Sequence, residues 1–144
     1  MPYTKRFLIL NGPNLNLLGR RNPAVYGRRD FDSYLHALRE RFPQWLIEYR
    51  QSNHEGDLID WLQAADGRYD GVVLNPGGYT HTSVALRDAV EAVSVPVVEV
   101  HISDISRREA FRRHSYISDV ARATVMGRGL DGYEEALRLL AGQQ

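Results

Sequence analysis

The sequence has no cysteine and only one lysine, Lys5, among its eighteen basic residues. Without cysteine, disulfides, thiol catalysis and cysteine-ligated zinc sites are excluded. The N-terminal segment also lacks a long hydrophobic run, because its apolar stretch covers only residues 7–10. Such a stretch is too short for a membrane span or a signal-peptide core. We therefore expect a cytoplasmic protein that does not bind membranes.

An excess of charge of one sign is missing as well. Eighteen acidic residues balance the eighteen basic ones, so the net charge gives no field that would gather nucleic acid. The material for a core is present, since 43% of the 144 residues are hydrophobic. A chain of this length buries a substantial core, and residues 1–144 are predicted to form a single domain.

Apolar runs rich in β-branched residues alternate with segments of helical period. The predicted strands are residues 7–10, 45–49, 71–75, 96–100 and 123–127. The helix signals are a start near Asp32, a cap at Asn53 before a helix over 57–65, and capping boxes joining Ser106 to Glu109 and Asp131 to Glu134. Parallel strands need crossovers, which are usually helical. The alternation predicts an α/β fold, a flavodoxin-like three-layer sandwich around a five-stranded parallel sheet.

Three segments that follow predicted strands carry most of the polar chemistry: residues 11–27, 75–83 and 101–109. Ligands of open α/β sheets bind at the carboxyl edge, where these segments would meet. The first segment separates its strand from the next helix by about twenty residues, and connections of that length are usually functional lids or disordered. A plain surface loop of turn-forming residues is the alternative interpretation.

The first two segments offer candidate catalytic groups. A guanidinium favours the phenolate form of a nearby tyrosine, so Arg21 close to Tyr26 would create a base. His81 and Asp88 are seven residues apart, which would place them on one face of a helix. A chance pairing of two polar residues behind a capped turn would give the same spacing.

The third segment pairs a carboxylate with an imidazole. Glu99 and His101 are two residues apart on a predicted strand and should point to the same face, where the carboxylate can orient the ring as a proton donor. A structural salt bridge would look the same. The arginines at 107, 108, 112 and 113 would either clamp a carboxylate or form a solvated face.

Residues 127–132, GRGLDG, match the glycine pattern of a dinucleotide-binding turn. Only twelve residues follow, too few for the acidic ribose ligand expected ~20 residues on, so we interpret the segment as a turn into a helix. No HExxH motif or close cluster of metal-ligand spacing occurs, and no metal or cofactor is predicted. A nucleotide- or phosphate-binding module and a purely structural assembly protein remain alternatives to an enzyme.

A phenolate base, an imidazolium acid, amide donors and arginine together suit the elimination of water from an anionic hydroxyketone. Four blocks carry a resemblance to a known family: NGPNLNLLGRRNPAVYG, NPGGYTHTSVALRDA, EVHIS and REAFRRHSYIS. In this order and spacing they resemble type II 3-dehydroquinate dehydratases (type II dehydroquinases) over nearly the whole chain. The resemblance implies cofactor-free dehydration of 3-dehydroquinate to 3-dehydroshikimate through an enolate, by a dodecamer built as a tetramer of trimers. The reaction would serve either the shikimate pathway of aromatic amino acid biosynthesis or quinate catabolism.

The resemblance also implies roles for individual residues. Tyr26 would be the proton acceptor activated by Arg21, and His101 the proton donor oriented by Glu99. Asn14 matches a position that holds a water near the enolate. The positions that match substrate-binding residues are Asn75, His81, Asp88, Ile102, Ser103 and Arg112. Of these, Asp88 matches a residue that also reaches across a subunit contact.

The scarcity of lysine supports the type II mechanism. Type I dehydroquinases use a lysine Schiff base, whereas Lys5 precedes the first predicted strand, at the opposite end from the post-strand segments. The sequence departs from the family pattern at Asp104, where asparagine is common, and over residues 126–129, where a more apolar stretch is usual. Neither departure touches the catalytic positions.

Overall fold

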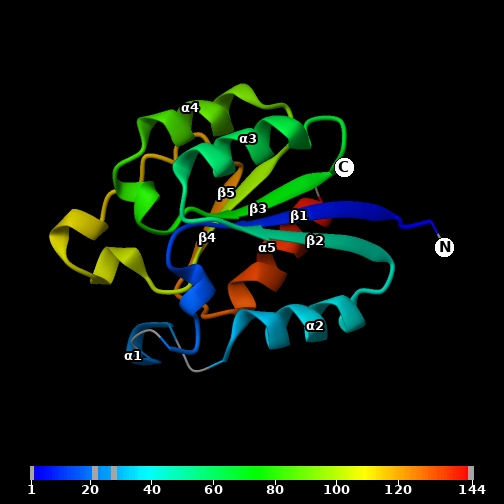
Figure 1. Ribbon diagram of the computed structural model, residues 1–144, viewed down its shortest axis with the longest axis horizontal. Helices are drawn as coiled ribbons and strands as arrows, with labels where there is room; N and C mark the ends of the chain where they lie inside the picture. Colours follow the sequence, from blue (N-terminus) through cyan, green and yellow to red (C-terminus); the bar gives the residue numbers. More distant parts are fainter. Residues whose placement is uncertain (1, 21–22, 27–28, 143–144) are drawn as a thin grey trace.

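A parallel sheet forms the centre of the molecule in the computed structural model, which describes residues 2–20, 23–26 and 29–142 (Figure 1). Its strands are β1 (Lys5–Asn11), β2 (Trp45–Gln51), β3 (Gly71–Asn75), β4 (Val97–His101) and β5 (Ala123–Met126). They lie in the order β2-β1-β3-β4-β5 and every neighbouring pair is parallel. The five predicted strands and the flavodoxin-like arrangement are therefore confirmed.

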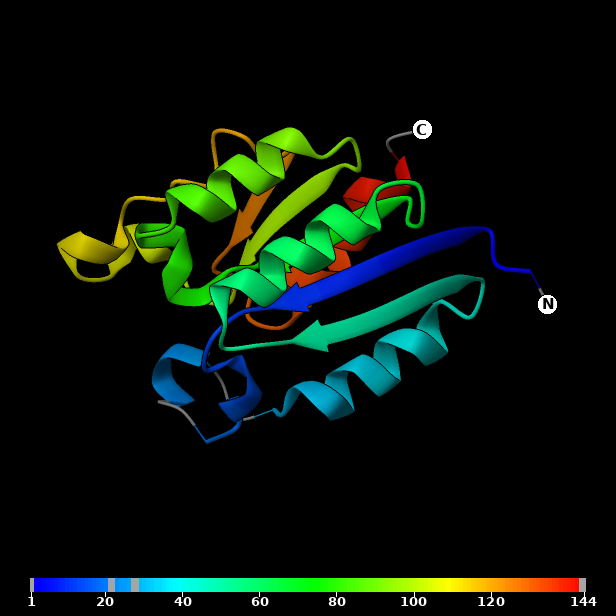
Figure 2. The ribbon, with the colours of Figure 1, turned by 45° about the horizontal axis from the view of Figure 1, so that its top comes forward.

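Helices cover both faces of the sheet, and the turned view separates the two layers (Figure 2). One face carries α2 (Phe31–Arg41) and α5 (Asp131–Gly142), and the other carries α3 (Glu55–Ala65) and α4 (Val84–Ala92). The alternation of side chains along β1 explains the two cores: Phe7 and Ile9 pack with α2 and α5, whereas Leu8 and Leu10 pack with α3 and α4.

Short elements fill the connections at the carboxyl edge of the sheet. The long segment after β1 contains the 3₁₀ helix η1 (Leu15–Leu17) and the single turn α1 (Pro23–Tyr26). The turn η2 (Gly77–His81) follows β3, and two more, η3 (Ile105–Arg107) and η4 (Ala110–Arg112), follow β4. Arg107 and Arg112 thus end two 3₁₀ turns, and Arg108 and Arg113 follow them as C-caps, so the helix start predicted at Ser106 gives only short turns.

Helix starts agree only in part with the predicted caps. The α2 helix begins one residue before Asp32, where Asp30 accepts a hydrogen bond from the Ser33 N–H at 2.8 Å. The N-cap of α3 is His54 and not Asn53. The Oδ1 atom of Asn53 accepts a hydrogen bond from the backbone N–H of Asn14 at 3.0 Å, so Asn53 stabilises the segment after β1.

Both predicted capping boxes are wrong. The N-cap of η3 is Asp104, which accepts the Ser106 N–H at 3.0 Å, so Ser106 does not start a helix with Glu109. The N–H of Glu134 donates to the hydroxyl of Tyr34 on α2 at 3.1 Å. A tertiary contact thus satisfies the amide that a local capping box would have used.

The backbones at the ends of β1 and β3 lie almost in contact. The Gly12 N–H donates to the carbonyl of Asn75 at 2.8 Å. A Cβ atom on Gly12 would lie 2.6 Å from the carbonyl oxygen of Pro76, so only glycine fits here. The close approach brings the two post-strand segments together where the strand order reverses, the place at which open α/β sheets bind ligands.

Candidate active site

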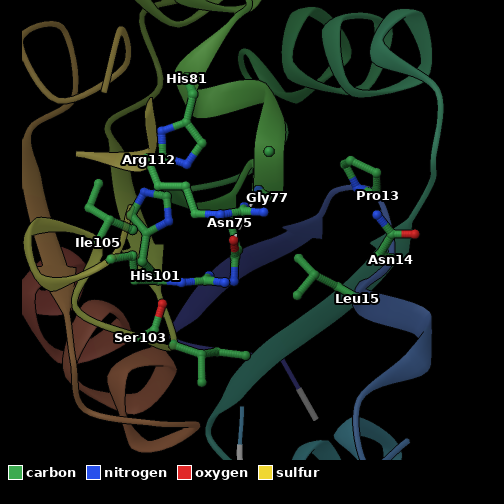
Figure 3. Close-up of a pocket in the computed structure, with 13 residues that line it drawn as sticks. Pro13, Asn14, Leu15, Asn75, Gly77, His81, His101, Ser103, Ile105 and Arg112 are labelled. Carbon is green, nitrogen blue, oxygen red and sulfur yellow. Dashed lines mark hydrogen bonds between the residues drawn. The ribbon is translucent and has the colours of Figure 1, made fainter. Parts of the chain in front are cut away.

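A cleft of about 280 Å³ opens at this point, at the carboxyl ends of β1, β3 and β4 (Figure 3). It is walled by the segments that follow these three strands. Its lining residues are Pro13, Asn14, Leu15, Asn75, Gly77, Gly78, His81, His101, Ile102, Ser103, Ile105, Arg108 and Arg112.

The two walls nearest β1 and β3 are held in unusual backbone conformations. Asn14 has a left-handed φ of 69°, and among the described residues it is the one non-glycine residue with positive φ. Gly77 faces it with φ of 60°, and a Cβ there would lie 3.1 Å from the carbonyl oxygen of Pro13. Glycine adopts this conformation without strain, whereas Asn14 must be held in it by its surroundings, and strain of that kind clusters at functional sites.

Asn75, the last residue of β3, projects from the floor of the cleft between Gly77 and His101 (Figure 3). Its Oδ1 accepts the Gly77 N–H at 3.1 Å, and its Nδ2 donates to the Tyr133 hydroxyl at 2.9 Å. The Tyr133 hydroxyl in turn donates to Oδ1 of Asn11 at 2.7 Å. We call Asn11, Asn75 and Tyr133 the amide cluster.

Glu99 and His101 point to the same face of β4, as their spacing predicts. The Nε2 atom of His101 lies 2.5 Å from Oε2 of Glu99. Glu99 is fully buried, whereas His101 lines the cleft. The imidazole is therefore the part of the pair that a bound molecule can reach.

Four hydroxyl groups hold the Glu99 carboxylate from behind. Its Oε2 accepts from Thr80 at 2.5 Å and from Ser115 at 2.8 Å, and its Oε1 accepts from Ser118 at 2.7 Å and from Thr124 at 3.1 Å. These donors come from η2, from β5 and from the segment between η4 and β5. We call Glu99 and these four residues the carboxylate cluster.

The cluster keeps Glu99 ionised. Burial alone would raise the pKa of Glu99, but hydrogen bonds from the ring of His101 and from surrounding hydroxyls outweigh it and lower the pKa to about 2. An ionised carboxylate can only accept, so Nε2 of His101 carries the hydrogen. The Nδ1 atom is then the ring position that is free to exchange a proton.

His81 contributes a second imidazole from the end of η2. Its Nδ1 lies 2.8 Å from the carbonyl oxygen of His114, which can only accept, so Nδ1 carries the hydrogen. Burial lowers the pKa of His81, and the positive charge of His101, Arg112 and Arg108 acts in the same direction. A neutral His81 presents the lone pair of Nε2, which suits a hydroxyl donor of a substrate.

Two arginines bring positive charge to the cleft, one from the C-cap of η3 and one from the end of η4. Arg108 and Arg112 line it, and Nε of Arg112 lies 3.2 Å from Oε2 of Glu109. Arg107 is 86% exposed and Nε of Arg113 donates to the carbonyl of Arg108 at 2.9 Å. The four arginines thus divide into two that face the cleft and two that do not line it, and Arg108 is the cleft arginine that sequence reasoning left out of the site.

The structure brings most of the predicted site residues together. Those that line the cleft are Asn14, Asn75, His81, His101, Ile102, Ser103 and Arg112. Glu99 lies directly behind His101. Arg21 and the side chain of Tyr26 lie outside the described residues, and with them the predicted base. The backbone of Tyr26 ends α1.

Asp88 is the exception among the predicted residues. It is exposed on α4 and does not line the cleft, whereas His81 ends η2. The prediction that His81 and Asp88 share one helix face is wrong, because α4 begins only at Val84. Its N-cap is Ser83, which accepts the Leu86 N–H at 2.8 Å. The role of Asp88 at a subunit contact stays a prediction.

Sequence reasoning missed the backbone-rich part of the cleft, namely Pro13, Leu15, Gly77, Gly78 and Ile105. The Gly-Pro and Pro-Gly-Gly turns carried the signal for three of them. The GRGLDG segment forms the turn into α5, which begins at Asp131, as interpreted. In the part of the chain that the structure describes, no helix has the length and apolar character to span a membrane.

A flavodoxin-like sheet with a histidine–carboxylate pair and two arginines in a cleft at its carboxyl edge is typical of an α/β protein that binds ligands there. The family model of class II dehydroquinases matches residues 5–141. The 3-dehydroquinate dehydratase 1 of Corynebacterium efficiens is 55% identical over 140 residues, which cover 96% of this chain and 93% of the relative.

Solved structures agree with the sequence relatives. The type II dehydroquinase of Propionibacterium acnes has a TM-score of 0.91 at 42% identity, covering 99% of this chain and 100% of that chain. The type II dehydroquinase of Butyrivibrio crossotus has a TM-score of 0.91 at 41% identity, covering 95% and 97%. The chain belongs to the class II dehydroquinase family, and the resemblance stated from its sequence blocks is confirmed.

Proposed function

We propose that the chain dehydrates 3-dehydroquinate to 3-dehydroshikimate through an enolate, without a cofactor. The observation that best supports this function is the cleft itself, which collects seven residues that family resemblance links to substrate and catalysis. Arg108 and Arg112 bring positive charge for an anionic substrate. Relatives with high identity over the whole chain carry the name 3-dehydroquinate dehydratase.

In the proposed mechanism Tyr26, kept as phenolate by Arg21, takes a proton from the carbon next to the ketone. The electron pair moves onto the ketone oxygen, and a water held by Asn14 stabilises the resulting enolate. His101 then donates a proton from Nδ1 to the β-hydroxyl while the carbon–oxygen bond breaks. Water leaves, and the enolate becomes the conjugated enone of the product.

Glu99 orients His101 in this mechanism and stabilises its protonated form, because the pair shares a 2.5 Å hydrogen bond. Asn75, His81 and the segment of Ile102 and Ser103 would bind the hydroxyl and carboxylate groups of the substrate. A Schiff base is disfavoured, since the single lysine begins β1 at the opposite edge of the sheet from the cleft.

Assembly and cellular setting belong to the same proposal. We infer a cytoplasmic dodecamer, a tetramer of trimers, in which Asp88 reaches from its exposed position on α4 towards a neighbouring subunit's cleft. The enzyme would serve shikimate biosynthesis or quinate catabolism, which share this dehydration. Light scattering of the purified protein would give the mass of twelve chains, and a monomer would contradict the assembly.

The test is the enone absorbance that develops when purified protein is mixed with 3-dehydroquinate. Tyr26→Phe should lower kcat by at least about a hundredfold, because it removes the general base. Tyr3→Phe, which changes an exposed tyrosine before β1, is the matched control and should keep the full rate. An inactive wild-type protein would contradict the function, whereas an active Tyr26→Phe would contradict only the identity of the base.

A further inference from the structure

Tyr133 is a fully buried tyrosine of α5 that lies outside the cleft yet touches one of its residues. Its hydroxyl bridges the side chains of Asn11 and Asn75, the last residues of β1 and β3, which are register partners. Asn11 is also fully buried. A hydroxyl at this place links the helix layer beneath the sheet to the floor of the cleft.

The Gly77 N–H determines which groups donate and which accept in the amide cluster. A backbone N–H can only donate, so the Asn75 atom that lies 3.1 Å from the Gly77 nitrogen must be the oxygen. Nδ2 of Asn75 then faces Tyr133 and donates to it. The single hydroxyl proton of Tyr133 is left for Oδ1 of Asn11, at 2.7 Å.

These hydrogen bonds determine which donor and acceptor groups of the Asn75 amide face the cleft. One of its two amide hydrogens and one oxygen lone pair are used inside the protein, so one N–H and one lone pair remain. Without Tyr133 only the Gly77 N–H would restrain the amide. Its rotation would then exchange donor and acceptor at the cleft floor, or turn the group away.

We propose that Tyr133 is a positioning residue, whose hydroxyl holds the amide of Asn75 in the orientation that presents an N–H donor to the substrate. This inference rests on the proposed function, in which Asn75 binds the substrate. It assigns a role in substrate binding to a residue of the helix layer that cannot touch the substrate.

The experiment compares steady-state kinetics and thermal unfolding of Tyr133→Phe with those of the unmodified protein on 3-dehydroquinate. A binding interaction of similar strength in ground and transition states affects KM alone, so we expect KM to rise about tenfold and kcat to stay within about threefold. An unchanged KM for Tyr133→Phe would overturn the proposal.

Tyr34→Phe is the matched control. Tyr34 belongs to the same aromatic cluster, with its ring 6.2 Å from that of Tyr133, and it is also buried. Its hydroxyl accepts the Glu134 N–H and has no hydrogen bond to either asparagine. Tyr34→Phe should lower the unfolding temperature without raising KM, and an equal rise in KM would mean that lost stability explains both variants.

A double variant separates orientation from stability. Tyr133→Phe with Asn11→Leu removes both partners of the Tyr133–Asn11 hydrogen bond, so the oxygen of Asn11 is not left unpaired. It also removes the longer bond of 3.5 Å from Nδ2 of Asn11 to the Tyr49 hydroxyl. KM should remain high in the double variant, because Asn75 still lacks its acceptor. A return of KM to the unmodified value would overturn the proposal.

A crystal structure of Tyr133→Phe gives a readout that does not depend on turnover. We expect the Asn75 side chain to occupy more than one orientation, whereas a single orientation on the Gly77 N–H would overturn the inference. Failure of the proposed function looks different, because the unmodified protein would then produce no enone while the crystallographic result still decides the role of Tyr133.

Discussion

The carboxylate cluster and the amide cluster lie on opposite faces of the same sheet edge. Glu99 shares the face of Val97, which packs with α3 and α4, whereas Asn75 shares the face of Val73, which packs with α2 and α5. Each cluster supports one cleft residue: His101 in the first case and Asn75 in the second. Among the described residues no buried side-chain nitrogen or oxygen atom lacks a hydrogen-bond partner.

The clusters differ in charge. The carboxylate cluster keeps an ionised group in the interior with hydroxyl and imidazole donors. The amide cluster is neutral, and burial raises the pKa of Tyr133 far above its ordinary value, so that its hydroxyl stays protonated. The charged cluster can therefore stabilise a protonated imidazole at His101, whereas the neutral one can fix only the geometry of Asn75. Variants of the first should change kcat, and variants of the second should change KM.

The largest effect on this comparison is expected from Glu99→Gln. Glutamine can still accept from Nε2 of His101, but it supplies no negative charge to stabilise the imidazolium. We expect kcat to fall by about a hundredfold with little change in KM, in line with the loss of general acid catalysis. Steady-state kinetics measure both constants. The control is Glu48→Gln, which changes a carboxylate on β2 that does not line the cleft. A rise in KM at constant kcat would contradict the division between the clusters.

The second prediction concerns the unfolding free energy at acidic pH. The pKa of Glu99 is lowered from 4.5 to about 2, so its contribution is complete above pH 4.5 and disappears as the pH falls towards 2. The loss should be roughly 3 kcal/mol, measured by urea unfolding between these pH values. Glu99→Gln should flatten the pH dependence, whereas Tyr133→Phe should lower the curve without changing its slope. Equal slopes for Glu99→Gln and the unmodified protein would refute the role of the charge.

The sequence was sufficient for the parts of the fold and site that depend on local periodicity. The strands follow from β-rich runs, and the Glu99–His101 contact follows from the two-residue repeat of a strand. Among the seven cleft residues, His81 and His101 were found because post-strand segments of a parallel sheet meet at one edge, which is a consequence of chain geometry. The other five came from the family resemblance: Asn14, Asn75, Ile102, Ser103 and Arg112.

What could not be predicted depends on partners that are distant in sequence. The Glu134 amide is capped by Tyr34, one hundred residues away, which no local capping box signals. The four hydroxyl donors of Glu99 and the Tyr133 bridge could not be predicted either. In the sequence, isolated serines, threonines and tyrosines look like ordinary surface or core residues. The residues that support a cleft residue are thus harder to predict than the cleft residue itself.

The smallest effect on kcat is expected from the loss of one hydroxyl donor in the carboxylate cluster. Ser118→Ala removes the 2.7 Å donor to Oε1 of Glu99, while Thr124 still donates to that oxygen at 3.1 Å. One of several hydrogen bonds to a charged group is lost, so kcat should fall about threefold to tenfold at constant KM. Ser118→Thr keeps the hydroxyl and should recover most of the rate. Ser106→Ala, at an exposed hydroxyl that bonds Asp104, is the control and should not change kcat. If Ser118→Ala lowered stability but left kcat unchanged, the hydroxyl would serve only to satisfy a buried charge, and the orientation of His101 would depend on Glu99 alone.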